Sequence, residues 1–288
     1  MNQPIITVFT PTYNRAYTLQ RLYDSLKSQT DYSFEWLIID DGSTDNTNEV
    51  VGEFCNDAFS IRYIKKENGG KHTAYNWALE EARGMYFICV DSDDTLASDA
   101  IATIFKSIES DTGICAYKSD MSGHMLGTPF PEGIECTTSF ELYTKYGCSG
   151  EYTFVYPTQI VAKVPFPVFE NERFVTESVV YDRLDNYCSV KLLPAVITIC
   201  EYQSEGYSAD TNKLIKENPA GYCLYYMQRI DKTDDIFQRV LIAGKYQCFK
   251  LIAKKQYSNY NGKHRTLVAA CIPLGMMFRL YYRFIRKI

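Results

Sequence analysis

Three carboxylates follow a short apolar run in the first third of the chain. Residues 85–90 are continuous and apolar, which predicts a buried parallel strand, and Asp91, Asp93 and Asp94 come directly after it. In an open α/β sheet, ligands bind beyond the carboxyl ends of the strands. Crowded carboxylates repel one another unless a cation neutralises them, and Mg²⁺ and Mn²⁺ prefer oxygen ligands. The cluster therefore predicts a metal that bridges the protein to a diphosphate, while a helix cap by Asp94 or Ser98 is the structural alternative.

Similar strand ends occur earlier in the chain. Strands are expected over residues 5–10, 34–39, 61–65 and 85–90, and helices around residues 19–26 and over 44–54, 73–82 and 98–108. This alternation predicts a parallel sheet with right-handed crossovers. Because the carboxyl ends of parallel strands meet at one edge, Asp40, Asp41, Asp91 and Asp93 should be neighbours, with a Gly-Gly-Lys turn beside them.

Finer expectations concern caps, helix faces and the second half of the chain. Ser43 or Thr44 should cap the second helix, and Trp77 and Phe105 should face the core. Further strands are expected over residues 113–117, 158–163 and 191–200, further helices over 139–146 and 177–184, and mostly helices from about residue 210. The predicted fold class is α/β: a mostly parallel, Rossmann-like sheet flanked by helices, with a helical C-terminal extension.

Composition narrows the class of protein. The 288 residues are 46% hydrophobic, which allows a substantial core, and the formal net charge of −5 argues against a general nucleic-acid binder. The ten cysteines contain no CxxC pair and are expected to be reduced core residues. No secretory leader and no apolar run of about 18 residues is visible, so a cytoplasmic protein is expected.

Four ordered motifs resemble family 2 glycosyltransferases with the GT-A fold. The matching stretches are residues 8–15 (VFTPTYNR), 36–45 (WLIIDDGSTD), 68–76 (NGGKHTAYN) and 91–94 (DSDD). The resemblance implies an inverting enzyme that uses a nucleotide-sugar donor. It implies a nucleotide-sugar-binding catalytic domain over residues 1–210 and an extension over 211–288. The absence of a Gln-x-x-Arg-Trp motif and of membrane spans favours addition of a single sugar over polymer synthesis.

The resemblance also implies roles for individual residues. Asp93 would bind Mn²⁺ or Mg²⁺ on the diphosphate, which would stabilise charge on the leaving nucleoside diphosphate, and the resemblance favours UDP as that nucleotide. Asp91 would hold the ribose, Asp41 would accept from the base, and the Tyr13 ring would pack near the base. The rest of the implied nucleotide-sugar site consists of Pro11, Thr12, Arg15, Asp40, Gly70, Lys71 and Ser92, with His72 as a less specific neighbour.

An inverting transfer needs a base that removes a proton from the acceptor hydroxyl. The family's acidic pair opens a helix beyond the sheet, and here Glu177 occupies that place but is followed by Ser178. Glu177 is the candidate base, with Asp182 and Glu172 as alternatives. Residues 201–208 resemble a segment that closes over the donor site in relatives.

The C-terminal tail combines apolar, aromatic and basic residues. Residues 267–278 are mostly apolar but contain Pro273 and Gly275, and a basic, aromatic stretch follows over 279–287. Such a stretch can lie in a membrane interface, although packing on the catalytic domain is the alternative. We expect peripheral contact through residues 267–288 at the inner face of the cell membrane, which would suit a polyprenyl-linked acceptor.

The sequence is compatible with three functions. The first is a glycosyltransferase that adds one sugar to a saccharide or lipid-linked saccharide in surface polysaccharide biosynthesis. A sugar nucleotidyltransferase should carry a Gly-rich phosphate loop after its first strand, where this chain has Pro11 to Asn14. A non-catalytic nucleotide-sugar binder stays open because the acidic pair at Glu177 is incomplete.

Overall fold

The computed structural model describes residues 4–55, 57–201, 210–253, 259–284 and 286. The chain divides into two compact units: residues 1–165 with 183–203, and residues 166–182 with 204–288. The second unit thus includes residues 166–182, which the sequence analysis assigned to the catalytic domain. The functional boundary at residue 210 stays a prediction.

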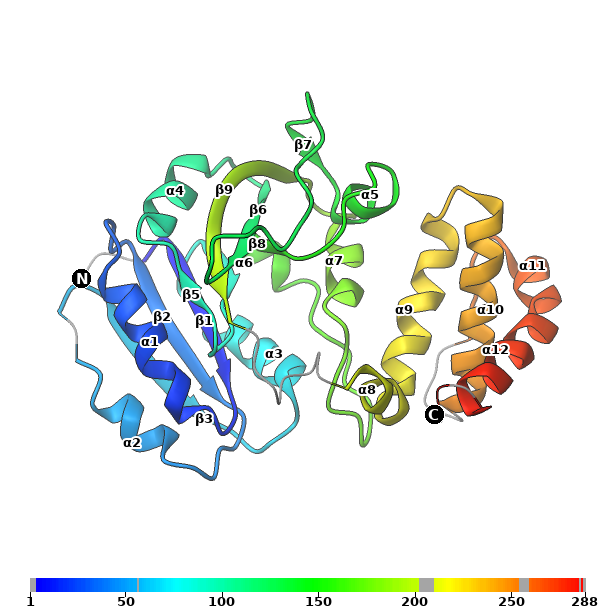
Figure 1. Ribbon diagram of the computed structural model, residues 1–288, viewed down its shortest axis with the longest axis horizontal. Coiled ribbons are helices and arrows are strands. Elements are labelled where there is room, and N and C mark those ends of the chain that lie inside the picture. The colour runs from blue at the N-terminus through cyan, green and yellow to red at the C-terminus, as the bar shows by residue number, and fades with distance from the viewer. Residues whose placement is uncertain (1–3, 56, 202–209, 254–258, 285, 287–288) are drawn as a thin grey trace. The chain divides into compact units, whose positions relative to one another are not determined.

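A mixed sheet forms the centre of the first unit (Figure 1). Its strands lie in the order β3 (Ser60–Lys65), β2 (Phe34–Asp40), β1 (Ile6–Thr12), β4 (Tyr86–Cys89), β8 (Tyr152–Pro157), β6 (Gly113–Asp120), β9 (Val190–Cys200) and β5 (Thr95–Leu96), and β7 (Cys136–Thr137) pairs with β9. The first four strands along the chain pair in parallel, whereas β8 runs antiparallel to both β4 and β6. The predicted α/β class is confirmed, and the antiparallel part is an addition to it.

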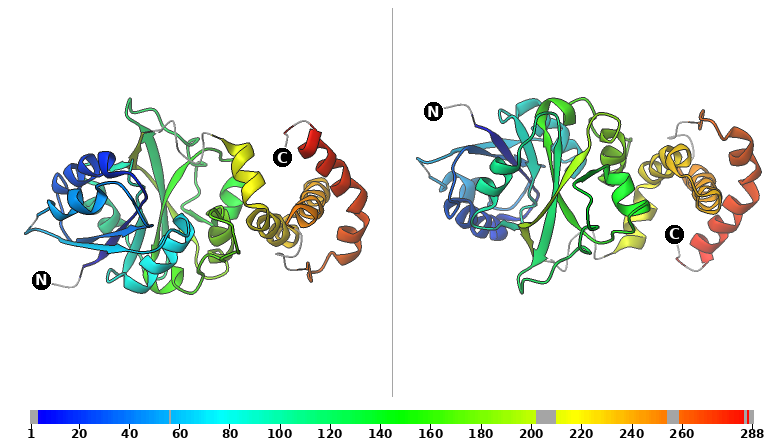
Figure 2. Two further views of the ribbon diagram at one scale, coloured as in Figure 1. Left: turned by 90° about the horizontal axis from the view of Figure 1, so that it is seen from below. Right: turned by 90° about the horizontal axis from the view of Figure 1, so that it is seen from above.

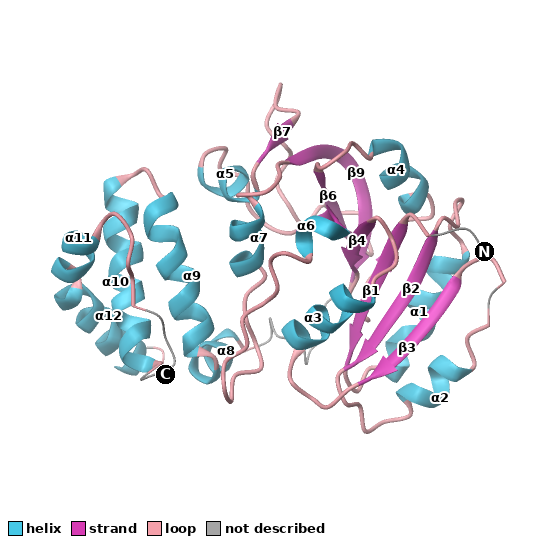
Figure 3. Cartoon of the chain, turned by 180° about the vertical axis from the view of Figure 1, so that it is seen from behind, coloured by secondary structure: helices cyan, strands magenta, loops and turns pink. Residues whose placement is uncertain are grey.

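Helices cover both faces of this sheet. The helices of the first unit are α1 (Ala16–Lys27), α2 (Thr47–Gly52), α3 (Lys71–Glu81), α4 (Ala100–Ser107), α5 (Ser139–Thr144) and α6 (Thr158–Val161). Figure 1 shows α1 and α4 on one face, and Figure 3, seen from behind, shows α3 and α6 on the other. Leu19, Leu22 and Leu26 of α1 are fully buried against the sheet, as their spacing predicts. The two apolar layers fix where the strands end, and therefore where the polar loops begin.

Several local predictions are wrong for physical reasons. The strand expected over residues 158–163 is helix α6, and the strand lies one step earlier, where all six residues of β8 are buried between β4 and β6. Trp77 and Phe105 are 41% and 45% exposed, because smaller or more central residues of α3 and α4 fill the core side. Helix α2 begins after Asn46, and the Asp45 carboxylate accepts from the N–H of Thr47 (3.1 Å) in place of a Ser43 or Thr44 cap.

Asp41, at the end of β2, holds the loop between β3 and α3. Its Oδ1 accepts from Lys66 Nζ (2.6 Å) and the Gly69 N–H (2.9 Å). Its Oδ2 accepts from the Gly70 N–H (2.7 Å) and Asn68 Nδ2 (3.1 Å). A carboxylate offers about four acceptor positions, so these contacts use them all. Gly70, with φ +95°, can take the backbone conformation that this approach requires, and α3 starts directly after it.

The second unit is helical. It contains α8 (Thr211–Glu217), α9 (Pro219–Lys232), α10 (Ile236–Ile252), α11 (Arg265–Ala270) and α12 (Ile272–Phe284), and most of α7 (Ser178–Leu184). Figure 2 views α9 and α10 close to their axes, with α11 and α12 (orange to red) beside α10. Tyr246 and Phe249 of α10 are buried at the centre. None of the helices that the structure describes has the length and apolar character needed to span a bilayer.

Gly84 provides a test of how β4 is held in the sheet. A Cβ at this position would lie 2.3 Å from the Thr7 nitrogen and 2.5 Å from the Ile6 carbonyl carbon, both backbone atoms of the β1 region. We expect Gly84→Ala to lower the free energy of unfolding by about 3 kcal/mol, because the backbone must shift to relieve the overlap. Urea denaturation followed by tryptophan fluorescence measures this. Gly52→Ala, where nothing lies within 4 Å, is the matched control and should change stability by less than about 1 kcal/mol.

The role of Asp41 can be tested in the same way. Asp41→Asn places an amide donor against Lys66 and the amides of Gly69 and Gly70, so we expect a loss of about 2–4 kcal/mol. Hydrogen exchange of the Gly69 and Gly70 amides should accelerate. Glu49→Gln, on the exposed side of α2, removes a charge nearby in the sequence and should leave both readouts unchanged. Unaltered protection of the two glycine amides in Asp41→Asn would show that the loop is held by other contacts.

Candidate active site

The turn after β4 carries four polar side chains, of which two are partly exposed to solvent and two are buried. The Asp94 N–H donates to the carbonyl oxygen of Asp91 (3.0 Å), which closes the turn. The side chains of Asp91 and Asp93 are 38% and 23% exposed, whereas Ser92 and Asp94 are buried. The spacing Asp-x-Asp therefore puts two carboxylates on the solvent side of the strand end, where the sequence analysis expects a ligand.

Basic side chains from two other elements meet these carboxylates. Lys71, the first residue of α3, contacts both oxygens of Asp91 at 2.7 and 2.8 Å. Arg15, directly before α1, has Nη1 3.8 Å from Asp93 Oδ2. Lysine and arginine are the usual partners of phosphate groups, so this edge of the sheet carries both the acidic and the basic groups that a metal-bound diphosphate needs.

The charges shift the pKa values of the two exposed carboxyls in opposite directions. Loss of water around Asp91 would by itself raise its pKa, but Lys71, Lys118 and Arg15 together outweigh this and lower the pKa. For Asp93, burial and the charge of Asp91 both raise the pKa. Asp93 is thus the carboxyl of this pair whose negative charge is less well compensated within the protein.

Asp94 faces the protein interior. Burial raises its pKa to about 7, against the opposing effect of Lys118, whose Nζ lies 3.6 Å from Asp94 Oδ2. The thiol of Cys200 donates to the same oxygen (3.4 Å). These contacts tie the acidic turn to the neighbouring strands β6 and β9, so Asp94 holds the turn in place instead of offering oxygens to solvent.

The loop after β1 brings the first motif to the same edge. Pro11 and Thr12 extend β1 through pairing with Ile39 and Asp40, so the strand is longer than expected. Tyr13 is 46% exposed. The Thr12 hydroxyl oxygen is buried and has no hydrogen-bond partner among the residues that the structure describes. A ligand that reached this hydroxyl would supply one.

Asn14 fixes the position of that loop. It has a φ of +52°, and its side-chain oxygen accepts from the N–H of Thr44 (2.7 Å), while its own N–H donates to Ser43 Oγ (2.9 Å). The loops after β1 and β2 are therefore joined. Asp40 is fully buried and accepts hydrogen bonds from the N–H of Ser43 and the hydroxyl of Tyr63. These bonds hold the loop after β2 against the end of the strand.

The carboxylates at this edge fit a divalent cation that is shared with a bound phosphate group. Within the described ranges, no group of three or more His, Cys, Asp or Glu side chains is arranged to hold a metal alone. Mg²⁺ and Mn²⁺ sites of substrate-bridging type need one or two carboxylates, with the remaining ligands from phosphate and water. Asp93, partly exposed and weakly paired at 3.8 Å from Arg15, matches that requirement.

The candidate bases all lie in the second unit. Glu177 directly precedes α7, and its carbonyl oxygen accepts from the N–H groups of Val180 and Tyr181 at 2.9 and 3.0 Å. Its side chain is half-buried. Glu177 therefore lies at the start of a helix, as its sequence predicts, while its chemical role stays a prediction.

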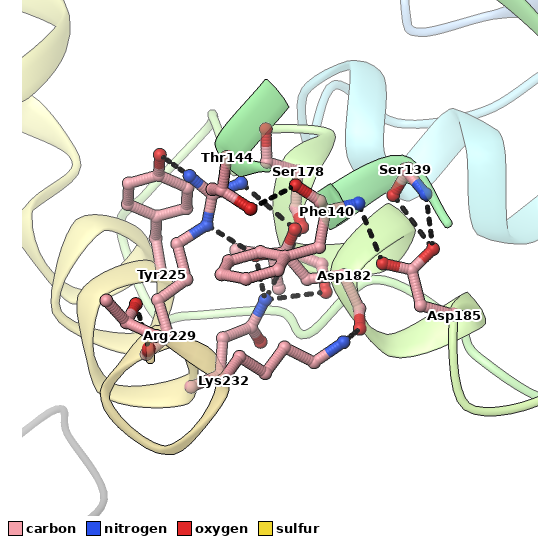
Figure 4. Close-up of polar contacts among 12 residues, drawn as sticks. Ser139, Phe140, Thr144, Ser178, Asp182, Asp185, Tyr225, Arg229 and Lys232 are labelled. Atoms are coloured by element: carbon pink, nitrogen blue, oxygen red, sulfur yellow. Dashed lines mark hydrogen bonds and ion pairs between the residues drawn. The ribbon is translucent and has the colours of Figure 1, made fainter. Parts of the chain in front are cut away.

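The two alternative bases have structural partners. Asp182 is 1% exposed, and its carboxylate accepts from Arg229 at 2.5 and 3.0 Å and from Gln228 (3.3 Å) (Figure 4). Glu172 is buried and accepts from the N–H groups of Ala220 and Gly221 at 2.6 and 2.9 Å, at the start of α9. Both carboxylates accept hydrogen bonds that hold the helical unit together, so each has a structural role in that unit.

Some residues of this edge were missed by sequence reasoning. These residues are Lys66 in the loop after β3, Lys118 in β6 and Arg21 in α1. A basic residue in such a position usually faces solvent, and no local sequence motif indicates a role for any of the three. Arg21 donates to the carbonyl oxygen of Asp93 and pairs with Glu201. Glu201 begins the segment expected to close over the donor site, and residues 202–208 of that segment lie outside the described residues.

Comparisons with known proteins agree with this geometry. The family model described as glycosyl transferase family 2 matches residues 7–146. The chondroitin synthase of Pasteurella multocida is 36% identical over 131 residues, which is 45% of this chain and 14% of the synthase. This chain therefore corresponds to a small part of that relative.

Solved structures share the fold over nearly the whole chain. S. aureus TarS 1-349 in complex with UDP-GlcNAc superposes with a TM-score of 0.60 at 17% identity, covering 96% of this chain and 91% of TarS. A mannosyltransferase from Pyrobaculum calidifontis, in complex with GDP-Man and Mn²⁺, has a TM-score of 0.57 at 16% identity, covering 100% of this chain and 84% of the other. The acidic turn, its basic partners and the match to the glycosyl transferase family 2 model all lie on the same strands, so residues 7–146 resemble this family.

Proposed function

We propose that this chain is an inverting glycosyltransferase that moves one sugar from a UDP-sugar to a saccharide or lipid-linked saccharide in surface polysaccharide biosynthesis. The observation that carries the proposal is the solvent-facing pair Asp91 and Asp93, with Lys71 and Arg15 against it, at the carboxyl ends of parallel strands. The UDP-GlcNAc complex of TarS supports a UDP-sugar donor, and the chondroitin synthase supports a role in polysaccharide synthesis.

In the proposed donor site, residues after β1, after β4 and at the start of α3 would bind different parts of the nucleotide-sugar. Tyr13, exposed after β1, would pack on the base, and the buried Thr12 hydroxyl would bond to the nucleoside. Asp91 would accept from the ribose hydroxyls, which requires it to share its oxygens with Lys71. Lys71 and Arg15 would then approach the diphosphate, whose charge is concentrated on the oxygens that leave with the nucleotide.

Asp41 and Gly70 act together in this proposal. All four acceptor positions of the Asp41 carboxylate are used inside the protein, so its main contribution is to hold Gly69 and Gly70 where the backbone can approach the nucleotide. An N–H group of the nucleotide base could reach Asp41 only by sharing a carboxylate oxygen that already accepts two hydrogen bonds within the protein. Ser92, buried in the acidic turn, supports the two carboxylates on either side of it.

A divalent cation completes the proposed site. Asp93 would hold Mn²⁺ or Mg²⁺, which when bound supplies positive charge to the departing diphosphate. The chain's own residues set the conditions for this: Asp91 keeps its charge through Lys71, and Arg15 lies far enough from Asp93 to leave an oxygen accessible. The Mn²⁺ complex of the mannosyltransferase supports a metal in this fold.

Metal-dependent donor binding is the first test. In the wild type, Mn²⁺ should tighten UDP binding by at least about tenfold, because the cation bridges two anionic groups. Asp93→Asn should remove this gain and leave metal-free UDP affinity unchanged or slightly higher, since the variant loses a negative charge near the diphosphate. Isothermal titration with and without Mn²⁺ measures both. Asp99→Asn, just beyond the turn, is the control; an undiminished Mn²⁺ effect in Asp93→Asn would assign the metal elsewhere.

The base is tested separately from donor binding. Glu177→Gln should lower transfer to an added acceptor or to water by about 10²–10⁴-fold, because the amide cannot accept a proton. UDP affinity should stay within about twofold, since the change preserves shape and lies on a different segment from the acidic turn. Glu170→Gln, an exposed residue on the same connecting segment, should keep wild-type turnover.

The same experiment separates catalysis from binding alone. A non-catalytic nucleotide-sugar binder would show no donor turnover in the wild type and no effect of Glu177→Gln. Peripheral membrane contact through residues 267–288 remains a prediction of the sequence, and its test does not depend on this reaction.

A further inference from the structure

Charge is distributed very unevenly along the chain. From Ile236 to the C-terminal residue of the sequence there is no Asp or Glu, while eleven Lys or Arg occur in the same stretch. The whole chain has a formal net charge of −5, so the preceding residues are strongly acidic. Helices α10, α11 and α12 therefore form a locally cationic region on an anionic protein.

Helix α12 leaves a wide apolar face uncovered. Ile272, Met276, Leu280 and Phe284 recur every four residues and are 43%, 53%, 53% and 67% exposed. Met277 and Tyr281 lie beside them and are 66% and 49% exposed. At 100° per residue these six side chains share one side of the helix, which we call the α12 stripe. It extends over about 18 Å, since an α-helix rises about 1.5 Å per residue.

The opposite side of α12 is already used for packing. A Cβ on Gly275 would lie 2.5 Å from Gln247 Cβ, and one on Gly244 would lie 2.7 Å from Leu274, so α10 and α12 are in close contact at these glycines. Tyr282 packs edge-on against Phe249 with ring centroids 5.5 Å apart. The α12 stripe is thus an additional apolar face, since the helix buries its other side in the unit's core.

Arginines border the stripe. Arg279 and Arg283 project within one turn of Leu280, and Arg286 follows the helix; Arg283 and Arg286 are exposed. At 100° per residue, Arg279 lies between the stripe and the packed side, and Arg283 lies at the same edge of the stripe, between Ile272 and Met276. From there, long basic side chains can reach phosphate groups while their stems cover apolar surface. Residues with this arrangement suit a helix that lies in the plane of a bilayer interface.

We propose that the α12 stripe docks on a bilayer that contains anionic lipids, with α12 parallel to the membrane surface. The apolar side chains enter the boundary between headgroups and acyl chains, and Arg279, Arg283 and Arg286 contact lipid phosphates. A second copy of this chain fits the surface less well, because a two-fold contact would bring the same arginines together with no acidic residue of α10–α12 to neutralise them. The structure thereby gives the predicted tail contact a defined face and a lipid class.

Vesicle sedimentation of the full chain tests this proposal. Wild type should sediment with phosphatidylcholine vesicles that contain phosphatidylglycerol and not with phosphatidylcholine alone. The double variant Met277→Ser with Leu280→Ser should lose at least about tenfold in partitioning, because both side chains leave the apolar phase. Arg283→Gln with Arg286→Gln should lose about tenfold or more, and added salt should mimic this loss.

Matched controls separate docking from general effects. Met121→Ser with Val168→Ser removes two side chains that are 61% and 64% exposed elsewhere on the protein and should not change partitioning. Lys106→Gln is the corresponding charge control. The single variant Phe284→Trp keeps the stripe apolar, so it remains informative if the serine variants fail to fold. Its added fluorescence should shift to the blue with anionic vesicles.

Two results would overturn the proposal. One is equal partitioning of wild type and the stripe variants, or no blue shift of Phe284→Trp at any lipid composition. The other is a wild-type dimer in sedimentation velocity that the Met277→Ser, Leu280→Ser variant converts to monomer, since the stripe would then bind a second copy. UDP binding is measured in the same samples, so a failure here is distinguishable from a failure of the proposed reaction.

Discussion

Crowding of carboxylates at the strand ends is the constraint on which the first unit depends. Asp41, Asp91, Asp93 and Asp94 meet at one edge of the sheet, and each has a basic partner from another element: Lys66, Lys71, Arg15 and Lys118. Leaving a buried charge unpaired costs several kcal/mol, so these pairs are needed before the sheet edge can close. Because every partner comes from a different loop, helix or strand, the pairs also set the positions of the loops that form the candidate site.

The pairs differ in how completely they satisfy the carboxylate. Asp41 is saturated, Asp94 is buried against Lys118 and Cys200, and Asp91 is held by both oxygens on Lys71. Asp93 has a longer contact with Arg15, and its pKa is raised by burial and by Asp91. One carboxylate at this edge therefore retains binding capacity, on a framework that the other three keep rigid. This is the arrangement expected where a cation and a diphosphate are to be bound together.

The strand and helix alternation over residues 5–108 could be predicted because each element carries its own periodic apolar face. The meeting of Asp40, Asp41, Asp91 and Asp93 at one edge of the sheet could be predicted because they follow parallel strands, whose carboxyl ends lie together. Strand β8 could not be found in this way, since its burial depends on β4 and β6, which are distant in sequence. The same holds for Lys66 and Lys118, and for Asp182 and Glu172, whose roles are set by α9. The α12 stripe needed the structure, because sequence alone does not say which side of an apolar helix is packed.

Crystals grown with UDP and Mn²⁺ give the most direct test of the central claim, through the anomalous scattering of manganese. If Asp93 holds the cation, one anomalous peak lies within coordination distance of an Asp93 oxygen, with the diphosphate between that ion and Lys71 and the base against Tyr13. A nucleotide bound away from the carboxyl ends of β1, β2 and β4, or a manganese peak that does not touch Asp93 while the diphosphate is ordered, would contradict it.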